Sequence, residues 1–309
     1  MKTAMSSYIF GPVPSRRLGR SLGVDLVPFK TCTYDCIYCQ LGRTTCKTTR
    51  RKEWVPREDV LAELGSKLPC GPDYITLSGS GEPTLHAHTG ELIERIRSMT
   101  DIPVAVLTNG SLLWQEEVRR QLVGASLVIP SLDAGDEIVF HAVNRPHEDI
   151  SFGRMLEGLI AFREEFPGEY WLEVFLLAGY TAIEAEVAKL ARCAERIRPD
   201  RVQLNTVARP PAQAYAVAVS AERMTELAAM FDPPAEVIAE FRDVHNHAEF
   251  AAGREEVLGM LRRRPCSLED IANGLGMHRN EVVKYLEELE AGQRITQSWA
   301  TGKAYYRLA

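Results

Sequence analysis

Cys32-Thr33-Tyr34-Asp35-Cys36-Ile37-Tyr38-Cys39 places three cysteines four and then three positions apart, directly after a strand-like run. Three thiolates at this spacing can bind three irons of a cubane iron–sulfur cluster, which normally takes four cysteine ligands. No fourth cysteine follows at short spacing, so one iron is left for a ligand that the protein does not supply. An iron with an open coordination position favours a catalytic role over electron storage.

A zinc site is the alternative interpretation of the same cysteines. A closed zinc site needs four ligands, often paired cysteines or histidines, and Cys46 is the nearby candidate for the fourth. Cys46 could also act as a hydrogen-donating thiol or as an auxiliary ligand to a cluster. The spacing alone leaves these alternatives open.

Four short polar segments follow apolar, strand-like runs farther along the chain. They are residues 78–84 (Ser-Gly-Ser-Gly-Glu-Pro-Thr), 108–110 (Thr-Asn-Gly), 131–133 (Ser-Leu-Asp) and 209–211 (Arg-Pro-Pro). Glycines allow the main chain to approach a ligand closely, and the carboxylate of Glu82 can pair with an ammonium group. One such segment is a weak signal because turns are rich in these residues. Four in order, each at a strand end, indicate one binding site.

Together these residues resemble the signature of the radical S-adenosylmethionine (SAM) superfamily. The resemblance implies that Cys32, Cys36 and Cys39 hold a [4Fe–4S] cluster whose open iron is chelated by the methionine end of SAM. It also implies reductive cleavage of SAM to a 5′-deoxyadenosyl radical that abstracts hydrogen from a substrate, with an electron from a flavodoxin or ferredoxin-like donor. The protein's part is then to orient the cofactor and exclude water. The implied SAM contacts are Tyr38, Gly79, Ser80, Gly81, Glu82, Thr108, Asn109, Ser131, Asp133 and Arg209.

Within the superfamily the chain is most similar to the wyosine-synthase-like group. The likeness lies in residues 10–23, 32–42 and 78–85 and extends over about residues 8–215. The tRNA wyosine synthases place three further cysteines upstream of the cluster motif, whereas no cysteine precedes Cys32 here. The resemblance is therefore to the group and not to its best-known reaction, and RNA is one option for an unidentified substrate.

Apolar strands alternate with amphipathic helices through the first two thirds of the chain. We expect strands at residues 22–27, 74–77, 103–107, 126–130, 171–177 and 202–206. Such alternation predicts an α/β fold with a parallel sheet, and six units give a partial (β/α)6 TIM-like barrel. Parallel barrels carry their chemistry at the C-terminal strand ends, where all four polar segments fall. We assign residues 1–215 to this core.

Residues 216–250 read as a connecting segment, and residues 251–309 as a second, small domain. Three helix-like stretches and a hairpin resemble a winged helix-turn-helix. This domain carries nine Lys or Arg and eight Asp or Glu residues, and its would-be recognition helix contains four glutamates. Phosphate contacts supply most nucleic-acid affinity, so the composition argues against DNA binding and for docking of a protein or an RNA substrate. His245 and His247 in the connecting segment are a weak metal-binding candidate.

Composition sets wider limits. The chain has 309 residues, 45% hydrophobic and 25% charged, as in an ordinary globular protein of one large and one small domain. The net charge of −6 gives no overall basic signature for nucleic acid. No run approaches ~20 apolar residues, so we expect no membrane span. Seven cysteines fit a reducing cytoplasm better than a disulfide framework.

Two basic runs flank the expected mouth of the barrel. The cations are Arg16, Arg17 and Arg20 before the first strand, and Arg43, Lys47, Arg50, Arg51 and Lys52 after the cysteine motif. They form either a rim for a phosphate-bearing substrate such as RNA or ordinary solvated charges. Three functional hypotheses follow: radical chemistry on RNA, the same chemistry on a small molecule or protein with the second domain as a docking module, or an iron–sulfur transcriptional regulator.

Overall fold

An eight-stranded sheet forms the centre of the protein in the computed structural model, which describes residues 7–15, 17–238, 254–275, 277, 279–300 and 303–309. The strand order is β1-β2-β5-β6-β7-β8-β9-β10. All neighbours from β2 onward are parallel, and β1 is antiparallel to β2. The strands are β1 Ile9–Ser15, β2 Gly19–Val24, β5 Tyr74–Leu77, β6 Val104–Thr108, β7 Leu127–Pro130, β8 Glu169–Leu176, β9 Arg201–Thr206 and β10 Glu236–Val237.

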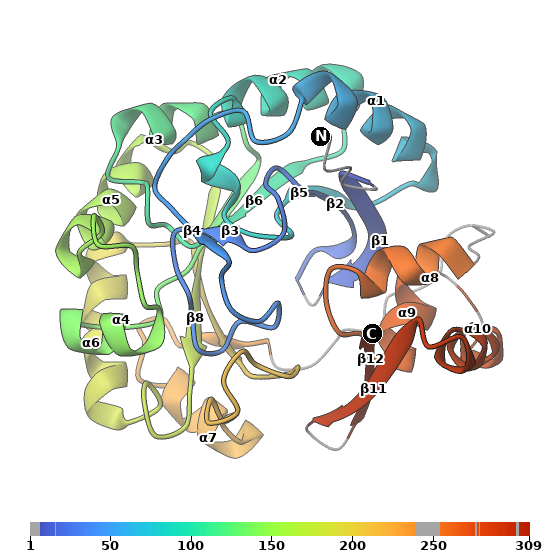
Figure 1. The fold of residues 1–309 in the computed structure, drawn as a ribbon. Coiled ribbons are helices and arrows are strands. Elements are labelled where there is room, and N and C mark those ends of the chain that lie inside the picture. The colour runs from blue at the N-terminus through green and yellow to red at the C-terminus, as the bar shows by residue number, and fades with distance from the viewer. Residues whose placement is uncertain (1–6, 16, 239–253, 276, 278, 301–302) are drawn as a thin grey trace.

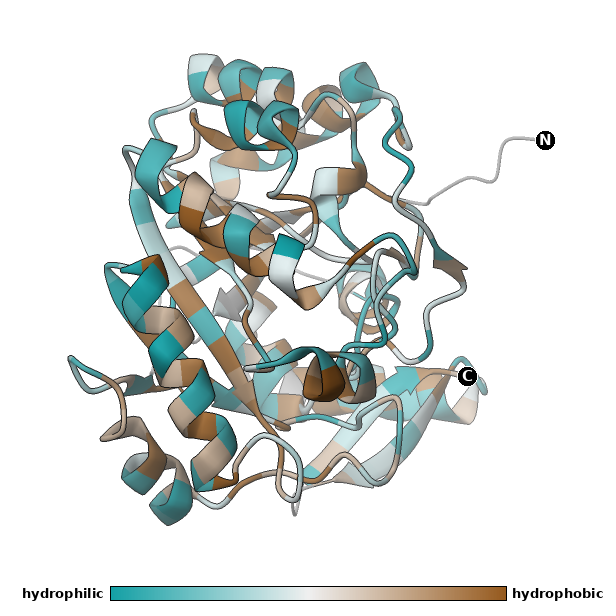
Figure 2. Ribbon diagram, turned by 90° about the vertical axis from the view of Figure 1, so that its left-hand side faces the viewer, coloured by the Kyte–Doolittle hydropathy of each residue, from teal (hydrophilic) through white to brown (hydrophobic). Residues whose placement is uncertain are grey.

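Helices cover the outside of this curved sheet in an arc (Figure 1). They are α1 Arg57–Lys67, α2 Thr89–Met99, α3 Glu116–Leu122, α4 Glu137–Val143, α5 Phe152–Glu165, α6 Glu184–Ile197 and α7 Ala221–Ala228, with short 3-10 turns at Leu68–Cys70 and Pro83–Leu85. Hydrophilic and hydrophobic residues mix along these helices in Figure 2, as helices with one buried face require. The parallel α/β architecture that the sequence predicts is confirmed, as a partial (β/α)6 barrel.

Local sequence explains the covering helices. In α2 the apolar residues Leu92, Ile93 and Ile96 repeat at helical spacing and are fully buried. At the start of α5, the Ser151 side chain accepts a hydrogen bond from the Arg154 N–H and caps the helix. The beginning and the inward face of these helices therefore follow from local sequence.

The two edge strands are additions to the predicted set. β1 contains Gly11, Pro12 and Pro14, which weaken the strand signal in the sequence. A sheet edge tolerates the prolines because the N–H groups that they lack are not needed by a further strand. At the other edge β10 pairs with β9, and α7 buries Met224 and Leu227 in the main core. Residues 216–238 of the predicted connecting segment thus lie on the barrel. His245 and His247 lie outside the described residues.

The C-terminal module consists of three helices and a hairpin in the predicted order. They are α8 Arg254–Leu261, α9 Leu268–Leu275, α10 Arg279–Ala291, β11 Ile295–Ala300 and β12 Lys303–Leu308. Ser267 and Asp270 bond each other's backbone N–H groups and so form a capping box at the start of α9. The winged-helix assignment itself stays a prediction.

Hydrophobic packing joins this module to the barrel. Val13 of β1 lies in the same buried cluster as Val257, Leu261 and Ile271 of the module, and Phe10 packs against that cluster. Figure 1 accordingly shows the module beside β1, at the side where the helical arc is open. Because β1 belongs to the barrel sheet, the module's core is completed by the barrel.

A smaller two-stranded sheet holds the cysteine motif. Strand β3, Thr31–Cys32, pairs in parallel with β4, Cys46–Lys47, over the carboxyl ends of the barrel strands. In the part of the chain that is described, no helix combines the length and hydrophobicity needed to cross a membrane.

We predict that replacing Val13 with alanine destabilises the C-terminal module together with the barrel. Removing two buried methyl groups should lower the free energy of unfolding by about 1–3 kcal/mol, measured by denaturant unfolding. Val217→Ala, at a side chain that is 54% exposed, is the matched control and should change it by less than about 0.5 kcal/mol. Equal effects of the two substitutions would contradict the shared core.

Candidate functional site

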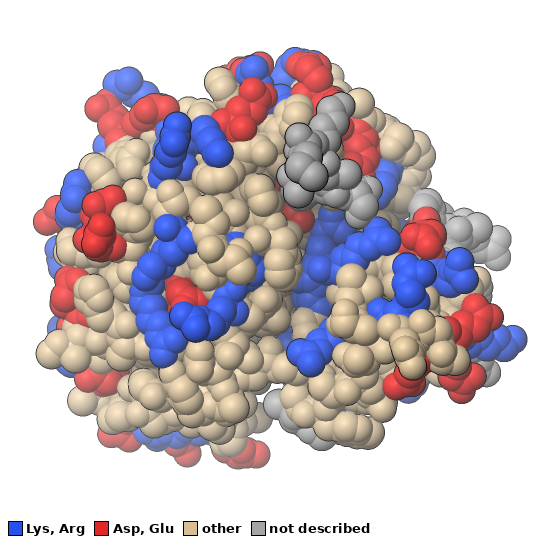
Figure 3. Space-filling view, viewed as in Figure 1, with Lys and Arg blue, Asp and Glu red and all other residues tan. Residues whose placement is uncertain are grey.

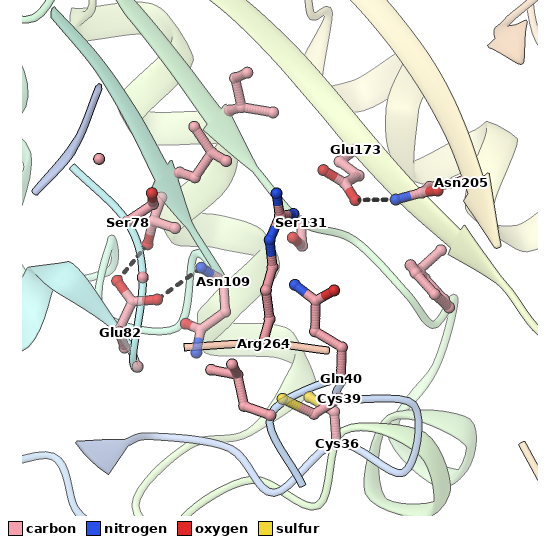
Figure 4. A pocket seen from close by; sticks show the side chains of 18 of the residues that line it. Cys36, Cys39, Gln40, Ser78, Glu82, Asn109, Ser131, Glu173, Asn205 and Arg264 are labelled. Atoms are coloured by element: carbon pink, nitrogen blue, oxygen red, sulfur yellow. Dashed lines mark hydrogen bonds between the residues drawn. The ribbon is translucent and has the colours of Figure 1, made fainter. Parts of the chain in front are cut away.

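A cavity of about 410 Å³ lies at the carboxyl ends of the barrel strands. Its walls come from the cysteine loop, from the polar segments after β5, β6, β7 and β9, and from the C-terminal module (Figure 4). The sequence predicts that strand-end segments share one site, and eleven of the thirteen predicted site residues line this cavity. They are Cys32, Cys36, Tyr38, Cys39, Gly79, Gly81, Glu82, Thr108, Asn109, Ser131 and Arg209.

 Ser80 and Asp133 are the two predicted residues that lie behind the cavity wall instead.

The three cysteines of the motif meet at one end of the cavity. Each sulfur receives its own N–H donor: Lys30 Nζ lies 3.2 Å from Cys39 Sγ, Asn109 Nδ2 lies 3.5 Å from Cys32 Sγ, and Asn144 Nδ2 lies 3.5 Å from Cys36 Sγ. Such donors stabilise negative charge on sulfur and tune the potential of a cluster bound to it.

The surroundings of Cys32 and Cys36 oppose ionisation of their thiols. Burial raises the pKa of the Cys32 thiol to about 12, and the neighbouring Glu82 carboxylate raises it further. Burial also raises the pKa of Cys36 well above its usual value, with additional contributions from Asp133 and the other two thiolates. A bound cation such as iron would remove this obstacle, because coordination favours the thiolate and releases the thiol proton to the solvent. The chemistry of the donor set therefore fits a cluster.

A mononuclear zinc site asks for a different arrangement. Within the described ranges, no three His, Cys, Asp or Glu side chains converge to hold a single metal ion. A cubane does not need that convergence, because each cysteine binds a different iron. Cys46, the fourth candidate, is exposed on β4 and is not among the residues that line the cavity.

Residues inside the motif hold the loop in shape. The buried Tyr34 ring packs edge-on against Phe140, with ring centroids 5.4 Å apart. Asp35 accepts a hydrogen bond of 2.6 Å from the Thr44 N–H and closes the loop behind the cysteines. These contacts, within the loop and with α4, hold the cysteine motif in its conformation.

Glu82 is a buried carboxylate that faces the cavity. Its Oε1 accepts hydrogen bonds from the Thr84 and Thr108 hydroxyl groups, and its Oε2 accepts one of 2.7 Å from the Asn109 N–H. Burial raises the pKa of Glu82, while these hydrogen bonds lower it. The donors fix the carboxylate on the cavity wall, where it can pair with an ammonium group.

The glycines of the same segment are required by close packing. Gly79 has a φ of +124°, and a Cβ at Gly81 would lie 1.8 Å from the Thr31 carbonyl oxygen. Any larger residue at position 81 would push the strand that carries Cys32. Ser80 points the other way, and its hydroxyl donates to Asp25 over 2.7 Å.

Asp133 corrects one expectation of the sequence. It was expected to face SAM, but it lies behind Tyr38, accepts a hydrogen bond from the Tyr38 hydroxyl, and accepts another of 2.6 Å from Asn144 Nδ2. Burial raises the pKa of Asp133 to about 6. The Tyr38 ring also stacks on Phe175 at 4.0 Å, so Asp133 and Phe175 together orient Tyr38 at the edge of the cavity.

Several lining residues escape the sequence analysis. Glu173 of β8 accepts a hydrogen bond of 2.9 Å from Asn205 Nδ2 on β9 and forms an ion pair with Arg17. A single acidic residue inside an apolar strand is the signal that could have found it. Lys30 and Gln40 line the cysteine end, and Arg263 and Arg264 enter from the C-terminal module.

Arg209, predicted beside the adenine, is also a contact between the two parts of the chain. Its guanidinium forms a buried ion pair with Asp270 of α9 over 3.1 Å. Nearby, the Tyr305 hydroxyl of β12 donates to the Ala208 carbonyl oxygen over 2.6 Å. The segment after β9 is therefore held by the module.

The predicted basic rim is only partly available to a partner. Arg17 pairs with Glu173, Lys52 lies over the Trp54 ring, and Arg51 donates to the Thr84 carbonyl oxygen and to Gln121. Arg16 lies outside the described residues.

We define the basic face as Arg43, Lys47 and Arg50, which are exposed members of that rim, together with the half-buried Arg145. Figure 3 shows Lys and Arg side chains gathered on the face of the molecule that carries β3 and β4. Lys47 reaches the Pro146 carbonyl oxygen, whereas Arg43 is 78% exposed at its side chain.

Comparison with known proteins identifies the family. The model of the radical SAM superfamily matches residues 26–191, more than half of the chain. A UPF0026 protein of Methanocaldococcus jannaschii is 39% identical over 227 residues, which cover 72% of this chain and 70% of that protein. A Brachyspira hyodysenteriae protein named GTPase Obg is 38% identical over 303 residues.

The last of these relatives is much longer than the present chain. The match covers 96% of this chain but 45% of that protein. The sequence here contains no Gly-x4-Gly-Lys-Ser/Thr phosphate-binding motif, so the name of that relative is not carried over.

A solved structure supports the fold. A radical SAM methyltransferase from Sphaerobacter thermophilus aligns with a TM-score of 0.56 at 15% identity, covering 72% of this chain and 67% of that one. The agreement of family model, relative and fold shows that this protein is an enzyme of the radical SAM superfamily.

Proposed function

We propose that this enzyme cleaves SAM reductively at the cysteine end of the cavity and abstracts hydrogen from a substrate group that enters the other part of it. The observation that carries the proposal is the meeting of Cys32, Cys36, Cys39 and Glu82 in one cavity. The volume of about 410 Å³ is in the range of small-molecule sites.

The superfamily uses a [4Fe–4S] cluster and SAM as cofactors. When bound, they supply a 5′-deoxyadenosyl radical. In our proposal the three cysteines hold the cluster, and Glu82 holds the SAM amino group. Gly79 and Gly81 leave room for the methionine end of SAM beside the main chain.

The strand-end residues take indirect as well as direct roles. Thr108 donates its hydroxyl to Glu82, and Asn109 donates its amide to Thr33 and toward Cys32, so both position other groups. Ser131, Tyr38 and Arg209 are the proposed contacts to the ribose and adenine of SAM. Asp133 orients Tyr38 and has no direct contact in this proposal.

Exclusion of water is the second task of the chain. Leu107, Ile129 and Val207 supply apolar surface to the cavity wall, and the C-terminal module covers part of its mouth. A low-polarity, enclosed site protects a reactive radical from side reactions.

Enzymes of this superfamily take their electron from an external donor. We propose that an acidic flavodoxin or ferredoxin-like protein docks on the basic face, because this face lies over the small sheet that carries Cys32. Charge complementarity of this kind mainly raises the association rate.

Nucleic-acid substrates receive less support. The rim expected to hold RNA loses Arg17, Arg51 and Lys52 to contacts within the protein. For DNA, Arg279 at the start of α10 pairs with Glu269 over 2.6 Å, which reduces the charge available to phosphates. We therefore favour a small molecule over RNA as the substrate, and an enzyme over a transcriptional regulator.

The first prediction concerns the cluster. Cys39→Ala should abolish both the binding of a [4Fe–4S] cluster and the formation of 5′-deoxyadenosine from SAM, because the two remaining cysteines cannot hold the cluster. Both are measured after anaerobic reconstitution. Iron and sulfide analysis reports the cluster, and chromatography of the products formed with dithionite reports 5′-deoxyadenosine. Cys46→Ala, at an exposed cysteine outside the cavity, is the matched control and should behave as the wild type. Loss of activity in both variants, or in neither, would refute the assignment.

The second prediction concerns the electron donor. Replacing Arg43 and Arg50 together with glutamine should lower the ratio of flavodoxin-driven to dithionite-driven 5′-deoxyadenosine formation about tenfold at low ionic strength. The same charge change at Arg95 and Arg120, on α2 and α3, is the control and should leave the ratio unchanged. An unchanged ratio in the Arg43 and Arg50 variant would remove the basic face as the docking site.

A further inference from the structure

Arg264 belongs to the C-terminal module, yet its side chain reaches into the barrel cavity. It lies in the segment between α8 and α9 and lines the same cavity as the cysteines. In Figure 4 its side chain extends between the residues Glu82 and Asn109 on one side and Glu173 and Asn205 on the other. In that view the guanidinium is drawn over Ser131 and points away from Cys36 and Cys39.

Neighbouring residues on both sides hold Arg264 in this place. Arg263 donates to the buried Asp25 carboxylate over 3.1 Å and to the Ser7 carbonyl oxygen over 2.7 Å, which ties the segment to the barrel. Cys266 exchanges two backbone hydrogen bonds with Tyr306 of β12, which ties it to the module. A side chain between two such anchors is held in position before a ligand binds, as a binding residue should be.

Arg264 forms no ion pair with a carboxylate of the described residues, and its Nη2 atom is buried without a hydrogen-bond partner. The nearby charge of Asp270 favours the charged guanidinium, but that carboxylate is bonded to Arg209. The Cys266 thiol lies close by, but burial raises the pKa of that thiol, so it supplies no negative charge. Burying an unpaired guanidinium costs free energy unless a ligand of opposite charge binds to it.

The two carboxylates of the cavity wall are already engaged. Glu82 accepts from Thr84, Thr108 and Asn109. Glu173 accepts from Asn205 and pairs with Arg17.

The neighbouring arginine strengthens the positive potential at this end of the cavity. Burial lowers the pKa of Arg264, and the charge of Arg209 lowers it further, so the two guanidinium groups repel each other. Asp270 offsets the charge of Arg209. An anion bound at Arg264 would relieve the remaining repulsion.

We propose that Arg264 binds an anionic oxygen group of the substrate, a phosphate or a carboxylate, and that the C-terminal module is thereby part of the substrate site. A guanidinium presents a planar pair of N–H donors that matches either group. The inference rests on the proposed function and names a substrate class for it: a small molecule that carries a phosphate or carboxylate. The carboxylate of SAM is a competing occupant, and the test separates it.

The test uses the full-length protein, anaerobically reconstituted, with an oxidised cluster and saturating SAM. Sodium pyrophosphate and sodium malonate are titrated separately by calorimetry, so that the two arms distinguish phosphate from carboxylate. We expect the wild type to bind at least one of these anions. Arg264→Gln should weaken that binding at least about tenfold, since a charge-assisted hydrogen-bonding pair is lost. Arg264→Lys, which keeps the charge but not the planar pair, should fall between.

Arg262→Gln is the matched control, because Arg262 lies two positions away, pairs with Glu255 and is not among the cavity-lining residues. It should bind the anions as the wild type does, and thermal melting should show that the variants fold. Three results would overturn the proposal: no binding of either anion to the wild type, equal binding to Arg264→Gln and the wild type, or a loss of SAM affinity in Arg264→Gln as large as the loss of anion affinity. Absence of 5′-deoxyadenosine alongside Arg264-dependent anion binding would instead overturn the proposed radical chemistry and leave this binding site standing.

Discussion

Three thiolates cannot share one buried pocket unless a cation lies with them, and this constraint organises the site. The barrel places Cys32, Cys36 and Cys39 at the carboxyl ends of its strands, with an amide or ammonium donor beside each sulfur. Burial and mutual repulsion raise the pKa values of Cys32 and Cys36, so these two thiols resist ionisation. In our proposal bound iron would supply the compensating positive charge, and the lack of a fourth protein ligand would leave a coordination position for SAM.

Much of the fold could be predicted from the sequence because its signals are local. The apolar runs before residues 78, 108 and 131 mark buried parallel strands, and their polar ends must meet at one edge of the sheet. The edge strand β1 was hidden because its prolines suppress the strand signal, although a sheet edge accepts them. The pairing of β1 with β2 depends on contacts with distant parts of the chain, which the composition of β1 does not reveal.

The same distinction between local signals and long-range contacts applies to the site residues. Glu82 is recognisable from its segment, whereas Asp133 was placed wrongly because the chain leaves β7 at Pro130 and turns the carboxylate toward Tyr38 and Asn144. Arg264 could not be assigned at all, since its link to the cavity depends on how a distant module packs on β1. Contacts of that kind follow from tertiary packing and leave no periodic mark in the sequence.

The C-terminal module therefore has a structural reason to be present that needs no nucleic acid. It shares a hydrophobic core with β1 and forms buried ion pairs with Asp25 and Arg209. These contacts bring the module to the mouth of the barrel. They couple its position to the same glycine-rich segment that carries Glu82, because Asp25 also bonds Ser80.

Electron paramagnetic resonance of the reduced, anaerobically reconstituted protein tests the central claim most directly. A site with three cysteines and one open iron predicts a [4Fe–4S] signal that changes its shape when SAM is added, because SAM becomes a ligand of that iron. A signal that stays the same at saturating SAM, or a protein that retains zinc in place of iron, would contradict the account.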